Sequence, residues 1–248
     1  MEKIVIVGTG ETAHMAHEYF TYDSPHEVVA FAVERPYIEE GQTELLGLPL
    51  VAFEEVEQHY PPSEFRAFVA MSSEPMNQLR ARLYAAAKRK GYSCISYVSS
   101  RAFVWHNVEI GENCFIFENN VVQHGVRIGN NVILWSGNHI GHQTVIEDNV
   151  FISSHVVVSG FCRVGRNSFL GVNSGVGDKV LLKRYTYLAM GAHVHKKTDV
   201  GRMYKGTPGK PDAVDVFQKF NIADDEPEPR PAAGARDQAS AAGGDGQG

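Results

Sequence analysis

Residues 139–165 read HIGHQTVIEDNVFISSHVVVSGFCRVG, and an aliphatic side chain returns at every sixth position of this stretch. The same spacing continues in both directions without a break. A fixed short period sustained over this length is the signature of a solenoid built from one repeated unit. The sixteen anchors of the series are Val104, Ile110, Ile116, Val122, Ile128, Leu134, Ile140, Ile146, Ile152, Val158, Val164, Leu170, Val176, Leu182, Leu188 and Val194.

The residues between the anchors predict the geometry of the repeat. Glycine often follows an anchor directly, where the backbone must turn tightly. One short strand and one turn for every six residues predict a flat face, and three faces close a prism of about 18 residues per coil. Residues 18 apart then lie in adjacent coils, about 4.8 Å from each other. His124 and His142 are therefore expected to stack, and Asn120 and Asn138 to form an amide ladder.

A different pattern precedes the repeat. Residues 4–7, 28–33 and 65–71 are apolar runs that predict buried strands, and residues 76–91 predict a helix that stops at Gly91. The loop GTGETA, residues 8–13, follows the first strand and leads into a helical stretch to about Tyr19. This alternation predicts a small parallel α/β domain of Rossmann-like type.

The predicted fold class is therefore α/β plus β. The Rossmann-like domain is expected at residues 1–98, the β-helix at 99–212 and a C-terminal extension at 213–248. Residues 224–248 are rich in Pro, Ala, Gly and Asp and are expected to be disordered.

Charge and composition exclude several classes of function. The net charge is −6, and residues 224–248 hold six acids against two arginines, so the rest of the chain carries about −2 and gives no electrostatic case for nucleic acid or an anionic membrane. No apolar run has the length of a membrane span, and MEKIVIVG lacks the sections of a signal peptide, so we interpret the protein as cytoplasmic. The three cysteines form no CxxC pair and are interpreted as buried apolar residues.

The hexads from 104 to 199, with the α/β domain before them, resemble the bacterial sugar O- and N-acyltransferases. That family includes sialic acid O-acetyltransferases and nucleotide-amino-sugar N-acetyltransferases. Residues 140–146, IGHQTVI, match the segment where the family carries its catalytic histidine, and residues 169–174 and 206–210 resemble its cofactor-lining coil and closing GxPxK turn. The resemblance implies a left-handed parallel β-helix, a homotrimer with active sites between subunits, and acetyl-CoA as co-substrate.

The function so implied is transfer of an acyl group, expected to be acetyl, to an amine or hydroxyl of a nucleotide-activated sugar in surface polysaccharide or glycan biosynthesis. Two positions depart from the family: Gln143 replaces the acid that often follows the catalytic histidine, and Thr12 replaces a histidine of the N-terminal loop. The implied site residues are His142 as general base, Gly160, Val172, Gly191, Lys196 and Lys197 for the oxyanion and acetyl-CoA, and Gly8, Thr9, Gly10, Thr12 and Glu34 for the sugar nucleotide.

Two other classes of protein remain open at this point. His106, His124 and His142 form one column by spacing, and some hexapeptide-repeat proteins are carbonic anhydrases that bind zinc through three histidines, so His106 and His142 could supply part of a metal site. A solenoid can also serve as a trimeric scaffold without activity.

Overall fold

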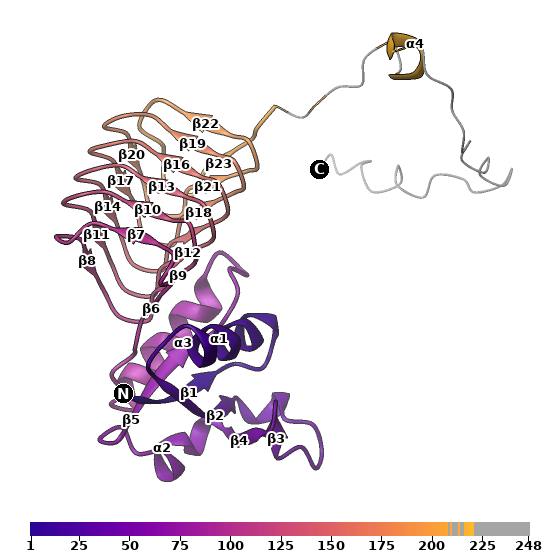
Figure 1. Cartoon of the computed structure of the whole chain (residues 1–248), viewed down its shortest axis with the longest axis vertical. Helices are drawn as coiled ribbons and strands as arrows, with labels where there is room; N and C mark the ends of the chain where they lie inside the picture. The colour runs from indigo at the N-terminus through magenta and orange to yellow at the C-terminus, as the bar shows by residue number, and fades with distance from the viewer. Residues whose placement is uncertain (208, 210–212, 214–215, 221–248) are drawn as a thin grey trace, which may run out of the picture. The chain divides into compact units, whose positions relative to one another are not determined.

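The computed structural model describes residues 1–207, 209, 213 and 216–220 (Figure 1). Met1–Pro208 form one compact unit, and the short helix α4 (Val216–Phe220) belongs to a second unit, Gly209–Gly248. The segment 224–248, expected to be disordered, lies outside the described residues. No helix among the described residues is long and apolar enough to cross a membrane.

The N-terminal part is a five-stranded sheet in the order β3-β4-β2-β1-β5. The strands expected at 4–7, 28–33 and 65–71 are confirmed as β1 (Lys3–Val7), β2 (Glu27–Val33) and β5 (Phe65–Val69), and these are parallel. β4 (Leu48–Ala52) pairs with β2, and β3 (Glu44–Leu45) is an antiparallel addition at the edge. The remaining elements are α1 (Glu11–Tyr22), η1 (Arg35–Tyr37), η2 (Phe53–Glu55), α2 (Val56–His59) and α3 (Gln78–Arg89).

The two faces of this sheet pack against different partners, because successive side chains of a strand point to opposite faces. Ile4 and Ile6 share a cluster with Phe20 of α1 and with aromatic side chains of the β-helix. Val5 and Val7 pack on the other face in a cluster that includes Leu83 of α3. The sheet is therefore fixed to the β-helix through one of its own hydrophobic faces.

The hexads form a parallel β-helix of three sheets, which matches the expected left-handed β-helix (Figure 1). Sheet I is β7 (Phe103–Val104), β10 (Val121–Val122), β13 (His139–Ile140), β16 (Val157–Val158), β19 (Gly175–Val176) and β22 (His193–Val194). Sheet II is β8 (Glu109–Ile110), β11 (Arg127–Ile128), β14 (Val145–Ile146), β17 (Arg163–Val164) and β20 (Leu181–Leu182). Sheet III is β6 (Tyr97–Val98), β9 (Phe115–Ile116), β12 (Ile133–Leu134), β15 (Phe151–Ile152), β18 (Phe169–Leu170), β21 (Tyr187–Leu188) and β23 (Met203–Tyr204).

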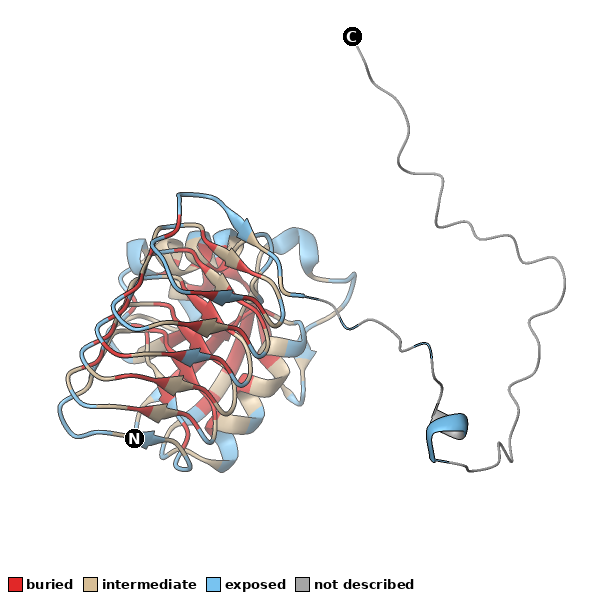
Figure 2. Ribbon diagram, turned by 90° about the horizontal axis from the view of Figure 1, so that it is seen from above, coloured by how far each residue is buried: buried red, intermediate tan, exposed pale blue. Residues whose placement is uncertain are grey.

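Three columns of turns join the sheets. Corner I–II contains residues 123–126, 141–144 and 159–162, corner II–III contains 129–132, 147–150 and 165–168, and corner III–I contains 117–120, 171–174 and 189–192. The registers β10–β13 and β13–β16 pair residues 18 apart, as predicted. Fourteen of the sixteen anchors are buried, and Figure 2 shows buried residues along the inside of the coils. Val104 and Ile110 are only partly buried, because β7 and β8 each pair with a coil on one side alone.

The amide ladder expected between Asn120 and Asn138 is not formed. Nδ2 of Asn120 donates to the carbonyl oxygen of Phe117 at 2.8 Å, and Oδ1 of Asn138 accepts from Val156 N–H at 2.8 Å. Both side chains point inward, so they satisfy backbone groups of the turns, which would otherwise be buried without partners.

An asparagine ladder does exist, at corner II–III. Asn113 donates to Asn131 at 2.8 Å, Asn131 to Asn149 at 2.8 Å, Asn149 to Asn167 at 3.2 Å, and Asn167 to the Tyr185 hydroxyl at 3.1 Å. All five residues have a positive φ, from 54° to 62°, a conformation that asparagine tolerates better than most residues. Each rung therefore fixes both a turn and its neighbour.

Buried polar groups join the α/β sheet to this corner. Asn113 accepts from Val69 N–H at 2.7 Å, at the end of β5. Arg80 of α3 is fully buried, and its guanidinium donates to the carbonyl oxygens of Asn131 and Asn149 at 3.3 and 3.4 Å. Burial lowers the pKa of Arg80 to about 9, which leaves the group charged at neutral pH. A buried cation whose hydrogen bonds go to carbonyl oxygens requires close packing between α3 and the coils.

Asp23, at the C-terminal end of α1, makes a second polar contact with the start of the β-helix. Its Oδ2 accepts from Ser100 N–H at 3.0 Å, from the Ser99 hydroxyl at 3.3 Å and from the Tyr97 hydroxyl. Hydrogen bonds from Ser100 and Tyr97 lower the pKa of Asp23 from 3.8 to about 2.

We expect Asp23→Asn to lower the melting temperature at neutral pH. Because the folded-state pKa is depressed, the carboxylate stabilises the fold above about pH 4 and loses this contribution as pH falls towards about 2. The difference in melting temperature between wild type and variant should therefore shrink between pH 5 and pH 3 in circular dichroism melts. A difference that stays constant over this range would show that the charge on Asp23 is not the cause.

Candidate functional site

His142 lies at corner I–II, in the turn between β13 and β14, and is half-buried. The preceding Gly141 has no room for a side chain, because a Cβ there would lie 2.5 Å from the carbonyl carbon of Ser159. The imidazole of His142 stacks on that of His124, with ring centroids 5.5 Å apart and planes at 15°, as the spacing predicted. It also makes an edge-to-face contact with the Phe161 ring, with ring centroids 4.9 Å apart and planes at 81°.

Gly160 of the next coil lies against the same imidazole. A Cβ at position 160 would lie 2.6 Å from Cε1 of His142 and 2.9 Å from Nε2, so only glycine leaves this ring its place. In the described part of the chain, no hydrogen-bond acceptor is found for the N–H of Gly160. A titratable ring and a backbone donor without a partner therefore lie side by side.

Gln143 stands where the family often has an acid, but it is not the side chain that hydrogen-bonds the imidazole of His142. The Gln143 side chain lies over Gly125, where a Cβ would be 2.6 Å from its Nε2. The side chain that bonds the imidazole is Gln123, one coil earlier. Its Oε1 lies 3.2 Å from Nδ1 of His142 and 2.9 Å from His142 N.

The other residues predicted for acetyl-CoA divide between two corners. Lys196 and Lys197 are exposed and continue the column of His142 and Gly160 at corner I–II. Val172 and Gly191 lie at corner III–I, where Gly191 N–H donates to the Val172 carbonyl at 2.9 Å. Sheet I separates the two sets, so one chain does not bring them together. Of the expected GxPxK turn, Pro208 and Lys210 lie outside the described residues.

The residues predicted for the sugar nucleotide lie in two separate cavities. Gly8, Thr9, Gly10 and Glu34 line one cavity of about 180 Å³ at the carboxyl ends of β1 and β2. Gly8 has φ 129°, and a Cβ there would lie 2.7 Å from the carbonyl oxygen of Ala70, so the turn requires glycine. Thr12 instead lines a separate cavity of about 80 Å³, whose walls include aromatic side chains of sheet III.

Glu34 already has a partner within the α/β part. Arg82 of α3 donates to its two carboxylate oxygens at 2.8 and 2.7 Å, and this pairing lowers the pKa of Glu34. The bond spans 48 residues, so no local sequence pattern indicates it. A ribose hydroxyl at Glu34 would therefore approach a carboxylate that is already held in place.

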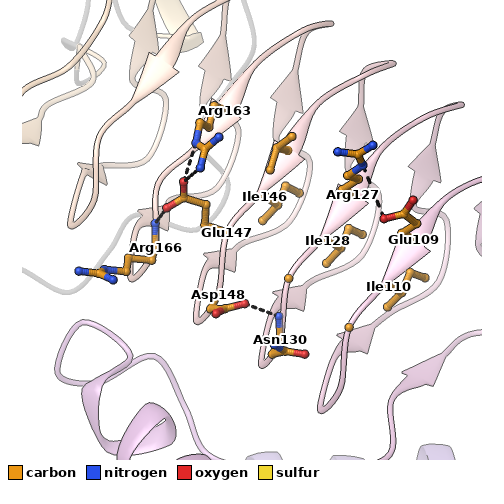
Figure 3. A pocket seen from close by; sticks show the side chains of 13 residues that line it. Glu109, Ile110, Arg127, Ile128, Asn130, Ile146, Glu147, Asp148, Arg163 and Arg166 are labelled. Atoms are coloured by element: carbon orange, nitrogen blue, oxygen red, sulfur yellow. Dashed lines mark hydrogen bonds and ion pairs between the residues drawn. The ribbon is translucent and has the colours of Figure 1, made fainter.

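A hollow of about 690 Å³ lies over sheet II and contains none of the predicted site residues (Figure 3). Its arginines lie beside acids: Arg127 is 3.5 Å from Glu109, and Arg163 is 2.5 Å from Glu147. These pairs neutralise the charges along the sheet. Arg166 also lines the hollow, where its backbone N–H donates to Glu147 at 2.9 Å.

The geometry of the histidine column does not favour a metal site within one chain. His106 and His142 are two coils apart, because β7 pairs with β10 and β10 with β13, a separation of about 9–10 Å. Two nitrogen ligands of one zinc ion lie within about 4 Å of each other. Among the described residues, no group of three His, Cys, Asp or Glu side chains could hold a metal ion.

Comparisons with known proteins agree with this architecture. A family model described as the GMPPB C-terminal domain matches residues 94–201. No curated protein sequence matches the chain. Among solved structures, a variant of perosamine N-acetyltransferase from Caulobacter crescentus, in complex with CoA and GDP-perosamine, is similar at a TM-score of 0.74 and 22% identity, over 85% of this chain and 96% of that one.

Two further structures show the same similarity. The acetyltransferase domain of PglB from Neisseria gonorrhoeae matches at a TM-score of 0.71 and 20% identity, over 85% of this chain and all of its own. WeeI from Acinetobacter baumannii matches at a TM-score of 0.68 and 16% identity, over 85% of this chain and 99% of that one. The resemblance drawn from the sequence is confirmed at the level of structure: the similar structures include sugar N-acetyltransferases, and the chain has their fold.

Proposed function

We propose that the protein transfers an acetyl group from acetyl-CoA to an amine or hydroxyl of a nucleotide-activated sugar, in surface polysaccharide or glycan biosynthesis, with His142 as general base. The observation that carries the proposal is the imidazole of His142 packed against Gly160, with Nδ1 engaged by Gln123. This arrangement leaves Nε2 as the ring nitrogen that can take a proton.

The chemistry needs few groups. Nε2 of His142 removes the proton of the acceptor as its nitrogen or oxygen attacks the thioester carbonyl carbon. The N–H of Gly160 donates to the oxyanion of the tetrahedral intermediate. When this intermediate collapses, the carbon–sulfur bond breaks, and the imidazolium returns the proton to the leaving thiolate. Two substrates held in one cleft need no covalent enzyme intermediate.

The similar structures support this choice of substrates. The Caulobacter protein was solved with CoA and GDP-perosamine, and the Neisseria domain with acetyl coenzyme A. In this chain, Lys196 and Lys197 supply cations for the phosphates of CoA. The cavity at Gly8, Thr9 and Gly10 adjoins the N-terminus of α1, where backbone N–H groups favour a phosphate. Thr12, in the neighbouring cavity, stays a proposed contact to the sugar.

We also propose a homotrimer built on sheet I. Phe103 and Val157 are about half exposed on its outer side. His142 lies at one border of this sheet and Val172 at the other, so a second copy that places its corner III–I against corner I–II of the first completes the site. Three copies close such a ring. Light scattering should give three times the chain mass, and a monomer at assay concentration would contradict both the trimer and the shared site.

The activity is tested by thiol release from acetyl-CoA across UDP-, dTDP- and GDP-linked amino sugars and free sialic acid. We expect release with at least one nucleotide-linked amino sugar, with one acetyl group found on the product by mass spectrometry. If no acceptor gives release and calorimetry detects no binding of acetyl-CoA, the scaffold interpretation replaces the enzyme.

A further inference from the structure

We propose that Gln123 is the positioning residue for His142: its carboxamide oxygen holds the imidazole in the tautomer protonated at Nδ1 and directs Nε2 towards the substrates. The inference rests on the proposed function, because Nε2 is the nitrogen that removes the proton there. The group that orients the imidazole is thus the neutral side chain of Gln123 in the preceding coil, and not Gln143, which follows His142 in the sequence.

The contact is bifurcated at one oxygen. Oε1 of Gln123 lies 2.9 Å from the backbone N of His142 and 3.2 Å from its Nδ1. Gln123 is itself fixed in the stack, since its backbone N–H donates to the carbonyl of Ile140 at 3.0 Å. The same residue thus connects the strand before the turn, the backbone of the turn and the ring.

The backbone partner decides which end of the carboxamide faces His142. The two ends of a glutamine amide are distinguished by their hydrogen-bond partners. A backbone N–H can only donate, so the group facing it must be the oxygen and not the NH₂. That oxygen can only accept, so the nearby Nδ1 must carry a proton. In the neutral ring, Nε2 is then unprotonated and can act as the base.

The ring has little freedom to leave this position. His124 stacks on one face at a centroid distance of 5.5 Å, and Phe161 makes an edge-to-face contact at a centroid distance of 4.9 Å. Gly160 lies so close that a single methyl group there would collide with Cε1. His124 is the only titratable ring that stacks on His142 among the described residues. Packing restricts the plane of the imidazole, and Gln123 determines which nitrogen is protonated.

A neutral partner has a distinct chemical consequence. A carboxylate in this place would stabilise the imidazolium, whereas an amide only orients the ring. We therefore expect Gln123→Glu to keep activity but to move the acidic limb of the pH–rate profile to higher pH. The shift would show that the side chain at position 123 faces Nδ1 in solution, and an unchanged profile would contradict this contact.

The decisive variant is Gln123→Met, which keeps the length of the side chain and removes its acceptor. We expect kcat to fall about 10- to 100-fold, because a fraction of the rings takes the wrong tautomer or orientation. The KM for acetyl-CoA should stay within about twofold. Gln143→Met is the matched control, since Gln143 lies over Gly125 and should tolerate the same exchange with full activity.

Nuclear magnetic resonance on protein labelled with ¹⁵N-histidine tests the tautomer without any assay of turnover. The His142 signals are assigned by their loss in His142→Gln. In the neutral ring we expect a protonated Nδ1 and an unprotonated Nε2, and a mixture of tautomers in Gln123→Met. Wild-type signals and wild-type kcat in Gln123→Met would overturn the proposal while acyl transfer stands. The predicted signals in a protein without transferase activity would refute the proposed function alone.

Discussion

His142→Ala should lower kcat by about 10² to 10⁴, the usual cost of losing a positioned general base. The loss should appear in kcat and leave acetyl-CoA affinity largely unchanged, because the proton moves only on the way to the transition state. His142 is half-buried at corner I–II and outside the hydrophobic core of the coils, so assembly and melting temperature should change little. Steady-state kinetics, calorimetric titration with acetyl-CoA and light scattering measure these three quantities.

His124→Ala is the control, one coil away in the same column. Its ring only stacks on that of His142, so we expect most of the activity to remain. If both variants lose activity equally, the two histidines act as a unit and the assignment of a single base is wrong. Full activity of His142→Ala would exclude it as the base.

Ile146→Ala should lower the free energy of unfolding by about 2–5 kcal/mol, the range found when a buried aliphatic side chain is truncated and a cavity remains. Ile146 is 1% exposed and lies in β14, between β11 and β17, so coils on both sides restrict how far the site can collapse. Urea unfolding followed by circular dichroism gives the value, and an unchanged slope of the transition would show that the unfolded state is not the cause.

Ile110→Ala is the matched comparison in the same sheet. Ile110 is an anchor of the same series, but it is only partly buried and β8 pairs on one side alone. We expect its truncation to cost less than half as much as that of Ile146. Equal costs would mean that the first coil is covered in solution.

The stacking of the coils could be predicted because the period fixes the register. A residue such as Ile140 is an anchor by spacing alone, and its pairing with Val122 and Val158 follows from the distance of 18 residues. The α/β part has no such period. There the sequence indicated β1, β2 and β5 but missed β4, whose run LPLVA contains Pro49, a residue that weakens the signal of a strand.

In the candidate site, too, the sequence predicts the contacts that follow from the spacing and not the others. The stack of His124 on His142 follows from spacing, but the contact to Gln123 spans 19 residues and crosses diagonally between coils, so periodicity does not predict it. The expected amide ladder was placed on the inward Asn120 and Asn138. The ladder instead runs through the left-handed turn positions, where each side chain meets the side chain of the next coil. The spacing predicts which residues form a column, whereas the direction of each side chain determines its hydrogen-bond partner.

Deamidation within the asparagine ladder would weaken the contact between the coils and the α/β sheet. Every rung donates its amide to the oxygen of the next, so hydrolysis of one amide to a carboxylate would set two acceptors against each other. Asn131 is fully buried, and the new charge would have no water around it. The same residue receives Arg80 at its carbonyl oxygen. Slow ageing at this rung would therefore loosen the attachment of the α/β sheet first, while the histidine at the opposite side of sheet II kept its surroundings.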